Sequence, residues 1–172
     1  MLDEAITIVP YDPRWPDMAD AEIERLRGEL DPLVVAYEHF GSTSVPGCDA
    51  KPIIDVLVGS ESWPVPVELR LGLVGLGYDD FAEAGVPGRL YFRARRPATF
   101  DVNLAVALFG GVLWQTNLRV RNRLRRDPAL VARYVREKRE ALSSGADTLL
   151  AYSAQKSAFM QELVRLSTYD EL

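Results

Sequence analysis

The stretch HFGSTSVPG at residues 39–47, followed by AKPIIDVLV at residues 50–58, decides the fold. The second segment is rich in β-branched residues and is typical of a buried strand, whereas the Gly- and Ser-rich first segment is typical of a loop. Backbone N–H groups in a Gly41-Ser42 turn can hold phosphate oxygens, and a strand carboxylate facing it, here Asp55, can hold the Mg²⁺ that accompanies phosphates. The pairing favours phosphate chemistry, with an ordinary turn as the alternative interpretation.

Outward from this stretch, hydrophobic periodicity and turn residues divide the chain into alternating helices and strands, followed by helices alone. We expect helices at residues 16–30, 67–76, 112–125, 128–142 and 148–166, with Asp127 and Asp147 as N-caps of the last two, and strands at residues 33–40, 53–58, 78–81, 89–95 and 99–106. Gly59 is expected to end the strand that carries Asp55. This order indicates an α/β or α+β core with a helical C-terminal layer.

Composition and charge limit the function classes. The chain has 172 residues, 48% of them hydrophobic and 26% charged, which is typical of a globular protein and predicts a single domain over residues 1–172. A net charge of −5 argues against general binding of nucleic acids or anionic membranes, because both need a cationic field. Small polar ligands remain open as substrates.

Cysteine content and the N-terminal residues predict a cytoplasmic protein. Cys48 is the single cysteine, so neither an intrachain disulfide nor a Cys-based zinc cluster can form. Residues 1–16 contain acidic residues and an early proline where a signal peptide needs basic residues and an apolar core. The longest apolar stretch, residues 104–114, is too short to span a bilayer.

The GSTSVPG to KPIID block is similar to that of the GrpB family, a branch of the DNA polymerase beta-like nucleotidyltransferase superfamily. Further matching residues are YDPRWP at 11–16, Gly77-Tyr78, Gly88-Arg89, Leu124-Arg125 before Asp127-Pro128, and the pairs Tyr134/Lys138 and Tyr152/Lys156. The resemblance implies a nucleotidyltransferase-like mixed sheet on which a nucleoside triphosphate donates its nucleotidyl group to a small acceptor. It also implies binding of the phosphates by Gly41, Ser42, Thr43, Ser44 and Lys51.

The superfamily pattern places two carboxylates two residues apart on one strand and a third on a neighbouring strand, since two cations clamp the attacking and leaving oxygens. Asp55 fits the first position, but the second falls on Leu57, which cannot bind a metal. Asp101 fits the third, and Asn103 shares its strand face; the family often has histidines in this strand. The expected site is a one-metal Mg²⁺ site of Asp55, Asp101 and Asn103, with both aspartates as catalytic residues.

Several cations are further candidates for phosphate contacts. Lys138 and Lys156 fall inside apolar arcs of their helices, so each ammonium must snorkel to solvent, pair with a structural partner or point at triphosphate oxygens. Arg89 is either a phosphate or substrate contact or an edge-strand charge. The five arginines between residues 119 and 126 are interpreted as a solvated helix face. His39, the single histidine, is interpreted as a residue that orients the loop by hydrogen bonding.

Three hypotheses for function follow. The first is a protein that binds a nucleoside triphosphate or related phosphorylated small molecule with Mg²⁺ and transfers a nucleotidyl group. The second is a catalytically degenerate nucleotide-binding or regulatory module, which the leucine at position 57 favours. The third is a partner domain that assists another enzyme, because members of the resembled family occur fused to a kinase of coenzyme A synthesis. No residue in the sequence marks the surface for a protein partner.

Overall fold

The computed structural model describes residues 7–96, 98–144 and 157–168. Its centre is a five-stranded sheet with strand order β1-β2-β5-β4-β3. The strands are β1 (Ala36–Phe40), β2 (Ile53–Ser60), β3 (Asp79–Asp80), β4 (Arg89–Ala94) and β5 (Asp101–Leu108). The β2–β5 pair is parallel and the other three pairs are antiparallel, so the sheet is mixed. The predicted α+β class with a mixed sheet is confirmed.

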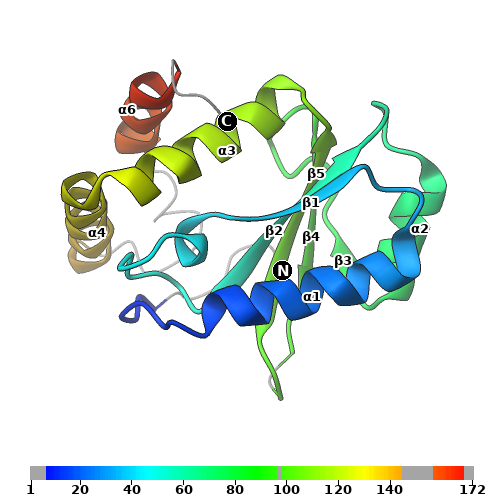
Figure 1. Ribbon diagram of the computed structural model, residues 1–172, viewed down its shortest axis with the longest axis horizontal. Coiled ribbons are helices and arrows are strands. Elements are labelled where there is room, and N and C mark those ends of the chain that lie inside the picture. The colour runs from blue at the N-terminus through cyan, green and yellow to red at the C-terminus, as the bar shows by residue number, and fades with distance from the viewer. Residues whose placement is uncertain (1–6, 97, 145–156, 169–172) are drawn as a thin grey trace.

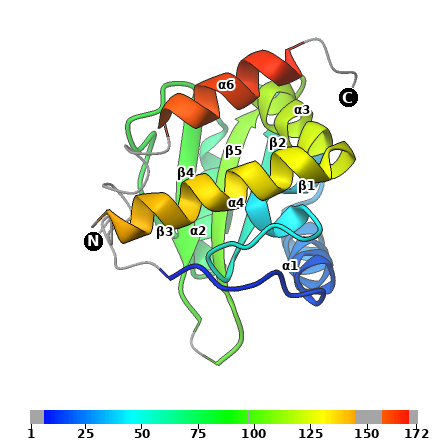
Figure 2. The same ribbon diagram turned by 90° about the vertical axis from the view of Figure 1, so that its left-hand side faces the viewer.

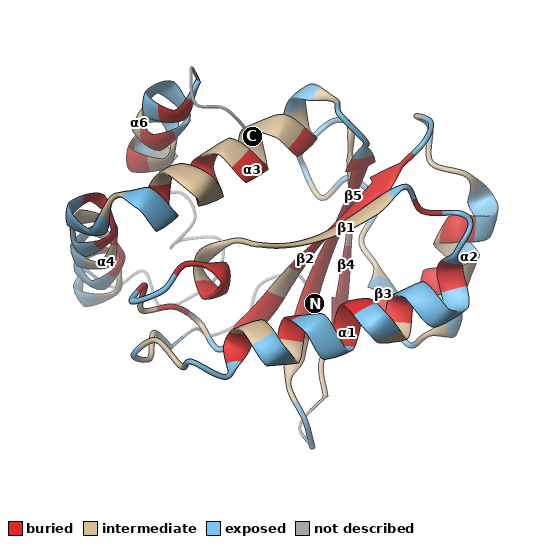
Figure 3. Ribbon diagram, viewed as in Figure 1, coloured by how far each residue is buried: buried red, intermediate tan, exposed pale blue. Residues whose placement is uncertain are grey.

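Side-chain alternation along the strands separates the two faces of the sheet. Ile54, Val56 and Val58 of β2 point to one face, where they join the main apolar core. This face is covered by α1 (Trp15–Leu30) and α2 (Val67–Gly75), which lie together on one side of the sheet in Figure 1. Figure 3 shows that these two helices bury the side facing the sheet and expose the other.

The opposite face of the sheet is covered by a helical layer made of α3 (Val112–Arg126), α4 (Pro128–Ser143) and α6 (Ser157–Ser167). In Figure 2, α4 crosses in front of the sheet with α6 beside it. Leu57 packs under α3 against Trp114, whereas Val45 and Cys48 of the loop after β1 join the apolar cluster of the helical layer. The loop is thereby held between the sheet and the helices.

Most expected elements lie where the sequence predicts them. Asp127 caps α4, because its carboxylate accepts a hydrogen bond of 3.0 Å from the backbone N–H of Leu130. The predicted cap Asp147 and residues 148–156 of the last predicted helix lie outside the described residues. No described helix is long and apolar enough to cross a membrane.

The expected end of β2 at Gly59 is wrong, since the strand continues to Ser60. A Cβ at Gly59 would lie 3.0 Å from the ring of Trp114 and 3.1 Å from that of Phe109. Gly59 is therefore a point of close packing inside the strand, which a glycine can serve as well as a turn.

Candidate functional site

A cavity of about 490 Å³ lies between the sheet and the helical layer. Its polar lining includes Gly41, Ser42, Thr43, Lys51, Asp55, Arg89, Tyr91, Arg93, Asn103, Asn117, Arg121, Tyr134 and Lys138. These residues come from the loop after β1, from the inward face of β2, β5 and β4, and from α3 and α4. Segments that are far apart in the sequence thus converge on one volume, which is within the usual range for a small-molecule site.

Asp55 is fixed in the cavity by close contact with the loop. Gly41 has φ +70° and ψ −169°, a conformation essentially restricted to glycine. A Cβ at Gly41 would clash with Asp55 Oδ2 and lie 3.0 Å from both Cβ and Cγ of that residue. The backbone of the loop therefore lies directly against the carboxylate.

Asn103 is the neighbour of Asp55 on β5, as the parallel register requires. Its Nδ2 donates a hydrogen bond of 2.9 Å to Asp55 Oδ1. Its Oδ1 accepts one of 3.1 Å from Nη2 of Arg95. The amide thus presents its nitrogen, not its oxygen, to the carboxylate.

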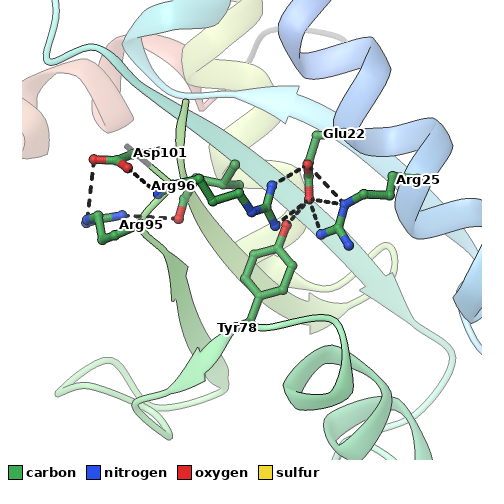
Figure 4. Close-up of polar contacts among 7 residues, drawn as sticks. Glu22, Arg25, Tyr78, Arg95, Arg96 and Asp101 are labelled. Carbon is green, nitrogen blue, oxygen red and sulfur yellow. Dashed lines mark hydrogen bonds and ion pairs between the residues drawn. The ribbon is translucent and has the colours of Figure 1, made fainter. Parts of the chain in front are cut away.

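Asp101 lies on β5 opposite Ile53 of β2, two residues before Asn103, which is opposite Asp55. Asp101 does not line the cavity. Its Oδ1 accepts a hydrogen bond of 2.8 Å from the backbone N–H of Arg96, and its Oδ2 lies 3.8 Å from Nε of Arg95. Figure 4 shows this carboxylate turned toward the connection between β4 and β5. In this structure, Asp101 orders the arginine that orients Asn103.

Glu22 of α1 forms a buried ionic cluster that the sequence interpretation missed. Its side chain is 2% exposed and pairs at 2.6 Å with both Arg25 and Arg96, and the hydroxyl of Tyr78 donates to it. Burial alone raises the pKa of Glu22, but the hydrogen bonds from Arg25, Arg96 and Tyr78 outweigh burial and lower it. Figure 4 shows that Arg96 links this cluster to the connection that carries Arg95.

A usable signal for Glu22 was present in the sequence. Its helical position falls within the apolar stripe formed by Ala19, Ile23, Leu26 and Leu30, all of which are buried. A carboxylate in such a stripe needs partners, although the partners are too distant in sequence to be named from the pattern.

Hydroxyls of the Gly-Ser loop bind mainly to the protein itself. Ser44 does not line the cavity and donates to the carbonyl of Gly41 at 2.7 Å. Thr43 Oγ1 lies 3.0 Å from Nε2 of His39, consistent with the predicted role of His39 in orienting the loop. Ser42 Oγ donates to the Tyr134 hydroxyl at 3.4 Å and lines the cavity.

Lys138 is 1% exposed and reaches the cavity from α4. Its Nζ donates to Cys48 Sγ at 3.2 Å and to the backbone carbonyl of Asp49, and lies 4.3 Å from the centroid of the Tyr134 ring. The lysine therefore has structural partners and also borders the cavity, whereas snorkelling to solvent is excluded. Lys156 lies outside the described residues.

The interpretation of the arginine run as a solvated helix face is wrong for one of its members, Arg121. Arg121 is only 10% exposed, pairs with Glu38 at 2.6 Å and donates to the carbonyl of His39 at 2.9 Å. Arg125 is exposed, as expected for that face, and its Nε donates to the carbonyl of Ser44 at 2.8 Å. These arginines fasten α3 to β1 and to the loop, which sequence spacing alone does not reveal.

The cavity is strongly cationic although the chain is acidic. Among the residues that the structure describes, five lysine or arginine side chains line it, against one carboxylate, that of Asp55, and the whole chain has a net charge of −5. The cations are Lys51, Arg89, Arg93, Arg121 and Lys138. Such a concentration of positive charge in a cleft attracts anionic ligands.

The residues present fit a Mg²⁺ ion only in a limited way. Within the described ranges, no group of three His, Cys, Asp or Glu side chains converges on a common point. Asn103 directs its amide nitrogen toward Asp55, so Asp55 is the carboxylate available at the cavity. This donor set fits an ion that takes most of its ligands from phosphate oxygens and water.

A family model described as GrpB protein matches residues 5–165. The chain belongs to the GrpB family. It is 34% identical over 166 residues to a UPF0157 protein of Halalkalibacterium halodurans, covering 94% of this chain and 82% of that protein. It superposes on the crystal structure of conserved protein GrpB from Enterococcus faecalis with a TM-score of 0.84 and 30% identity, covering 96% of this chain and 100% of that one.

Part of this GrpB chain also matches a larger protein. It is 39% identical over 74 residues to a dephospho-CoA kinase of Mycobacterium bovis, which covers 41% of this chain and 18% of the kinase.

Proposed function

We propose that this GrpB protein binds a nucleoside triphosphate or a related phosphorylated small molecule in the cavity and that it belongs to the nucleotidyltransferase superfamily. The observation that carries the proposal is the excess of lysine and arginine around Asp55 in an otherwise acidic chain. Phosphate groups match such a cavity because charge-assisted hydrogen bonds to oxyanions are strong.

In the proposed complex, the phosphates lie against Gly41 and Ser42, with Lys51 and Lys138 beside them. Mg²⁺ is shared between phosphate oxygens and Asp55, which gives the one carboxylate in the described cavity lining a role among the cations. Phe40, Tyr134 and Met160 also line the cavity and supply apolar surface for the uncharged part of the ligand.

A second candidate function is binding without efficient nucleotidyl transfer, and Leu57 favours it. Its side chain is 0% exposed and packs with Ala105, Trp114 and Leu118. The position that the superfamily pattern gives to a second metal ligand is therefore part of the apolar core. With one cavity carboxylate, a second catalytic cation is poorly held, and transfer is expected to be slow or absent.

A partner-domain role is the third possibility, and the partial match to a dephospho-CoA kinase favours it. In this case the ligand cavity regulates or assists another enzyme. Absence of nucleotide binding by the isolated protein would favour this role over the first two.

The test is calorimetric titration of ATP and GTP, with Mg²⁺ and with EDTA, into wild type, Asp55→Asn and the control Asp20→Asn. Asp20 is exposed on α1, across the sheet from the cavity. With Mg²⁺, we expect Asp55→Asn to weaken binding about tenfold or more, equivalent to about 1.4 kcal/mol. With EDTA, the same variant is expected to bind at least as tightly as wild type, because the lost carboxylate repels phosphate.

Two results would contradict the proposal. One is no binding of either nucleotide under both conditions. The other is equal weakening by Asp55→Asn with and without Mg²⁺, which would indicate damage to the cavity rather than loss of a metal ligand. Release of pyrophosphate with an added acceptor would show that one cavity carboxylate is enough for transfer.

A further inference from the structure

Three side chains of β4 form a continuous surface along one side of the cavity. Arg89, Tyr91 and Arg93 are every second residue of the strand, so they share its inward face, and all three line the cavity. The register places Arg93 opposite Asn103, which in turn lies opposite Asp55. Tyr91 and Arg89 lie two and four residues before Arg93 on the same face of the strand.

Tyr91 holds both arginines in place. The guanidinium carbon of Arg89 lies 5.1 Å from the centroid of the Tyr91 ring, and that of Arg93 lies 5.3 Å from it. Nε of Arg93 also donates to the Tyr91 hydroxyl at 3.1 Å. Contacts of this kind fix the guanidinium groups before a ligand arrives, which lowers the entropy lost on binding.

Arg89 differs from Arg121 and Lys138 in what surrounds it. Arg121 pairs with Glu38, and Lys138 is satisfied by Cys48 and Asp49. By contrast, Nε of Arg89 is buried without a hydrogen-bond partner in the part of the chain that the structure describes. Burial also lowers the pKa of Arg89, which reflects an incompletely compensated charge.

The position of β4 leaves the edge-strand interpretation of Arg89 as an alternative, because β3 pairs only with Phe92 and Arg93, although the Arg89 side chain lines the cavity. It also separates Arg89 from the Gly-Ser loop. That loop follows β1, so β2 and β5 lie between the two groups in the strand order. Adjacent strands are about 4.8 Å apart, so the backbones of β2 and β4 are separated by roughly 10 Å.

We infer that Arg89, stacked on Tyr91, is the anchor of a second subsite that binds the oxyanion group of a separate, acidic small molecule. This inference rests on the proposed function and deepens it, because it gives the nucleotide's co-ligand an acidic group, a carboxylate or a phosphate monoester. The planar guanidinium offers paired donors that match either group. The Gly-Ser loop holds the phosphates of the nucleotide, Asp55 holds their Mg²⁺, and Arg89 holds the co-ligand.

The test follows the Arg89 Nε–H signal in ¹H–¹⁵N spectra of the full chain, assigned from its loss in Arg89→Gln. Inorganic phosphate and acetate are titrated separately, with and without saturating Mg-ATP. We expect one of these anions to shift the Arg89 signal saturably in both conditions. Arg89→Gln is expected to weaken that binding about tenfold or more, and Arg89→Lys to restore only part of it.

Arg133→Gln is the matched control, since Arg133 pairs with Glu162 between α4 and α6 and does not line the cavity. Its phosphate and acetate affinities should equal those of wild type. Circular dichroism of each variant separates loss of binding from loss of fold, and the wild-type signal itself reports binding if a variant does not fold.

The outcomes separate this inference from the proposed function. If phosphate or acetate shifts the Arg89 Nε–H signal while ATP does not bind, the result supports the subsite and refutes nucleotide binding. ATP binding with no anion response at Arg89 refutes the subsite and leaves the proposed function intact. If ATP itself shifts the Arg89 Nε–H signal and competes with phosphate, Arg89 binds the nucleotide, and this result would overturn the separate subsite.

Discussion

The substitution Gly41→Ala tests whether the loop backbone positions Asp55. Two effects add at this residue. Alanine in the Gly41 conformation costs about 1–3 kcal/mol in backbone strain. Its Cβ would also overlap Asp55 Oδ2, so the carboxylate must move away from Asn103. Losing a hydrogen bond to a charged group costs about 1.5–3 kcal/mol, and we therefore expect a total loss near 4 kcal/mol.

Gly47→Ala is the matched control, because Gly47 is in the same loop and also has a positive φ, +74°, but a Cβ there would have nothing within 4 Å. Strain alone predicts a loss of about 1–2 kcal/mol for this variant. The assay is equilibrium unfolding in urea, with Mg-ATP titration as a second measurement. Gly41→Ala should lose about 2 kcal/mol more than Gly47→Ala and should also lose ligand affinity. Equal stability losses, or unchanged affinity in Gly41→Ala, would refute the positioning role.

Three further predictions concern buried groups. Burial, aided by nearby arginines, lowers the pKa of His39 from 6.5 to about 4. As the pH falls, His39 is therefore protonated in the unfolded chain before it is protonated in the folded chain, so the free energy of unfolding decreases between about pH 6.5 and about pH 4. His39→Gln should remove up to about 3 kcal/mol of that pH dependence, measured as the difference between urea unfolding series. Leu57→Asp should lower the free energy of unfolding by about 3 kcal/mol or more, because it buries an unpaired carboxylate, and should not gain pyrophosphate release. Leu57→Met should lower the free energy of unfolding by less than about 1.5 kcal/mol. In urea unfolding, Glu22→Gln should lower the free energy of unfolding by about 3 kcal/mol and Glu24→Gln by less than about 1 kcal/mol. Each carboxylate pairs with an arginine three residues later, but of the two only Glu22 is buried.

Much of the fold could be predicted because each local pattern agrees with the final environment. The β-branched run before Gly59 is buried in β2, and the apolar spacing before Leu30 forms the inner face of α1. The continuation of β2 past Gly59 could not be predicted, because it depends on the pairing of Gly59 and Ser60 with β5, which is distant in sequence. A glycine followed by polar residues has the same local pattern whether the strand ends or continues.

The site was predictable in part for a similar reason. Gly41, Ser42 and Asp55 lie within one short stretch, and the period of two correctly places Asp55 and Asn103 on one face once β2 and β5 are adjacent. The same reasoning gives no information about the contacts of Asp101 with Arg95 and with the backbone of Arg96, and Asp101 does not line the cavity. Partners of this kind come from the tertiary fold.

The leucine at position 57 and the location of α3 are best understood together. Residues 55 and 57 share the inward face of β2, but of these two only Asp55 lines the cavity, because Leu57 packs against Trp114 and Leu118 of α3. A carboxylate at position 57 would face these apolar side chains and not the ligand. Restoring the superfamily pattern therefore requires moving α3 as well as changing one residue. In the present arrangement, any cation beside Asp55 must take its remaining ligands from water and from the bound molecule, so we expect ligand and Mg²⁺ to bind together, each strengthening the other's affinity.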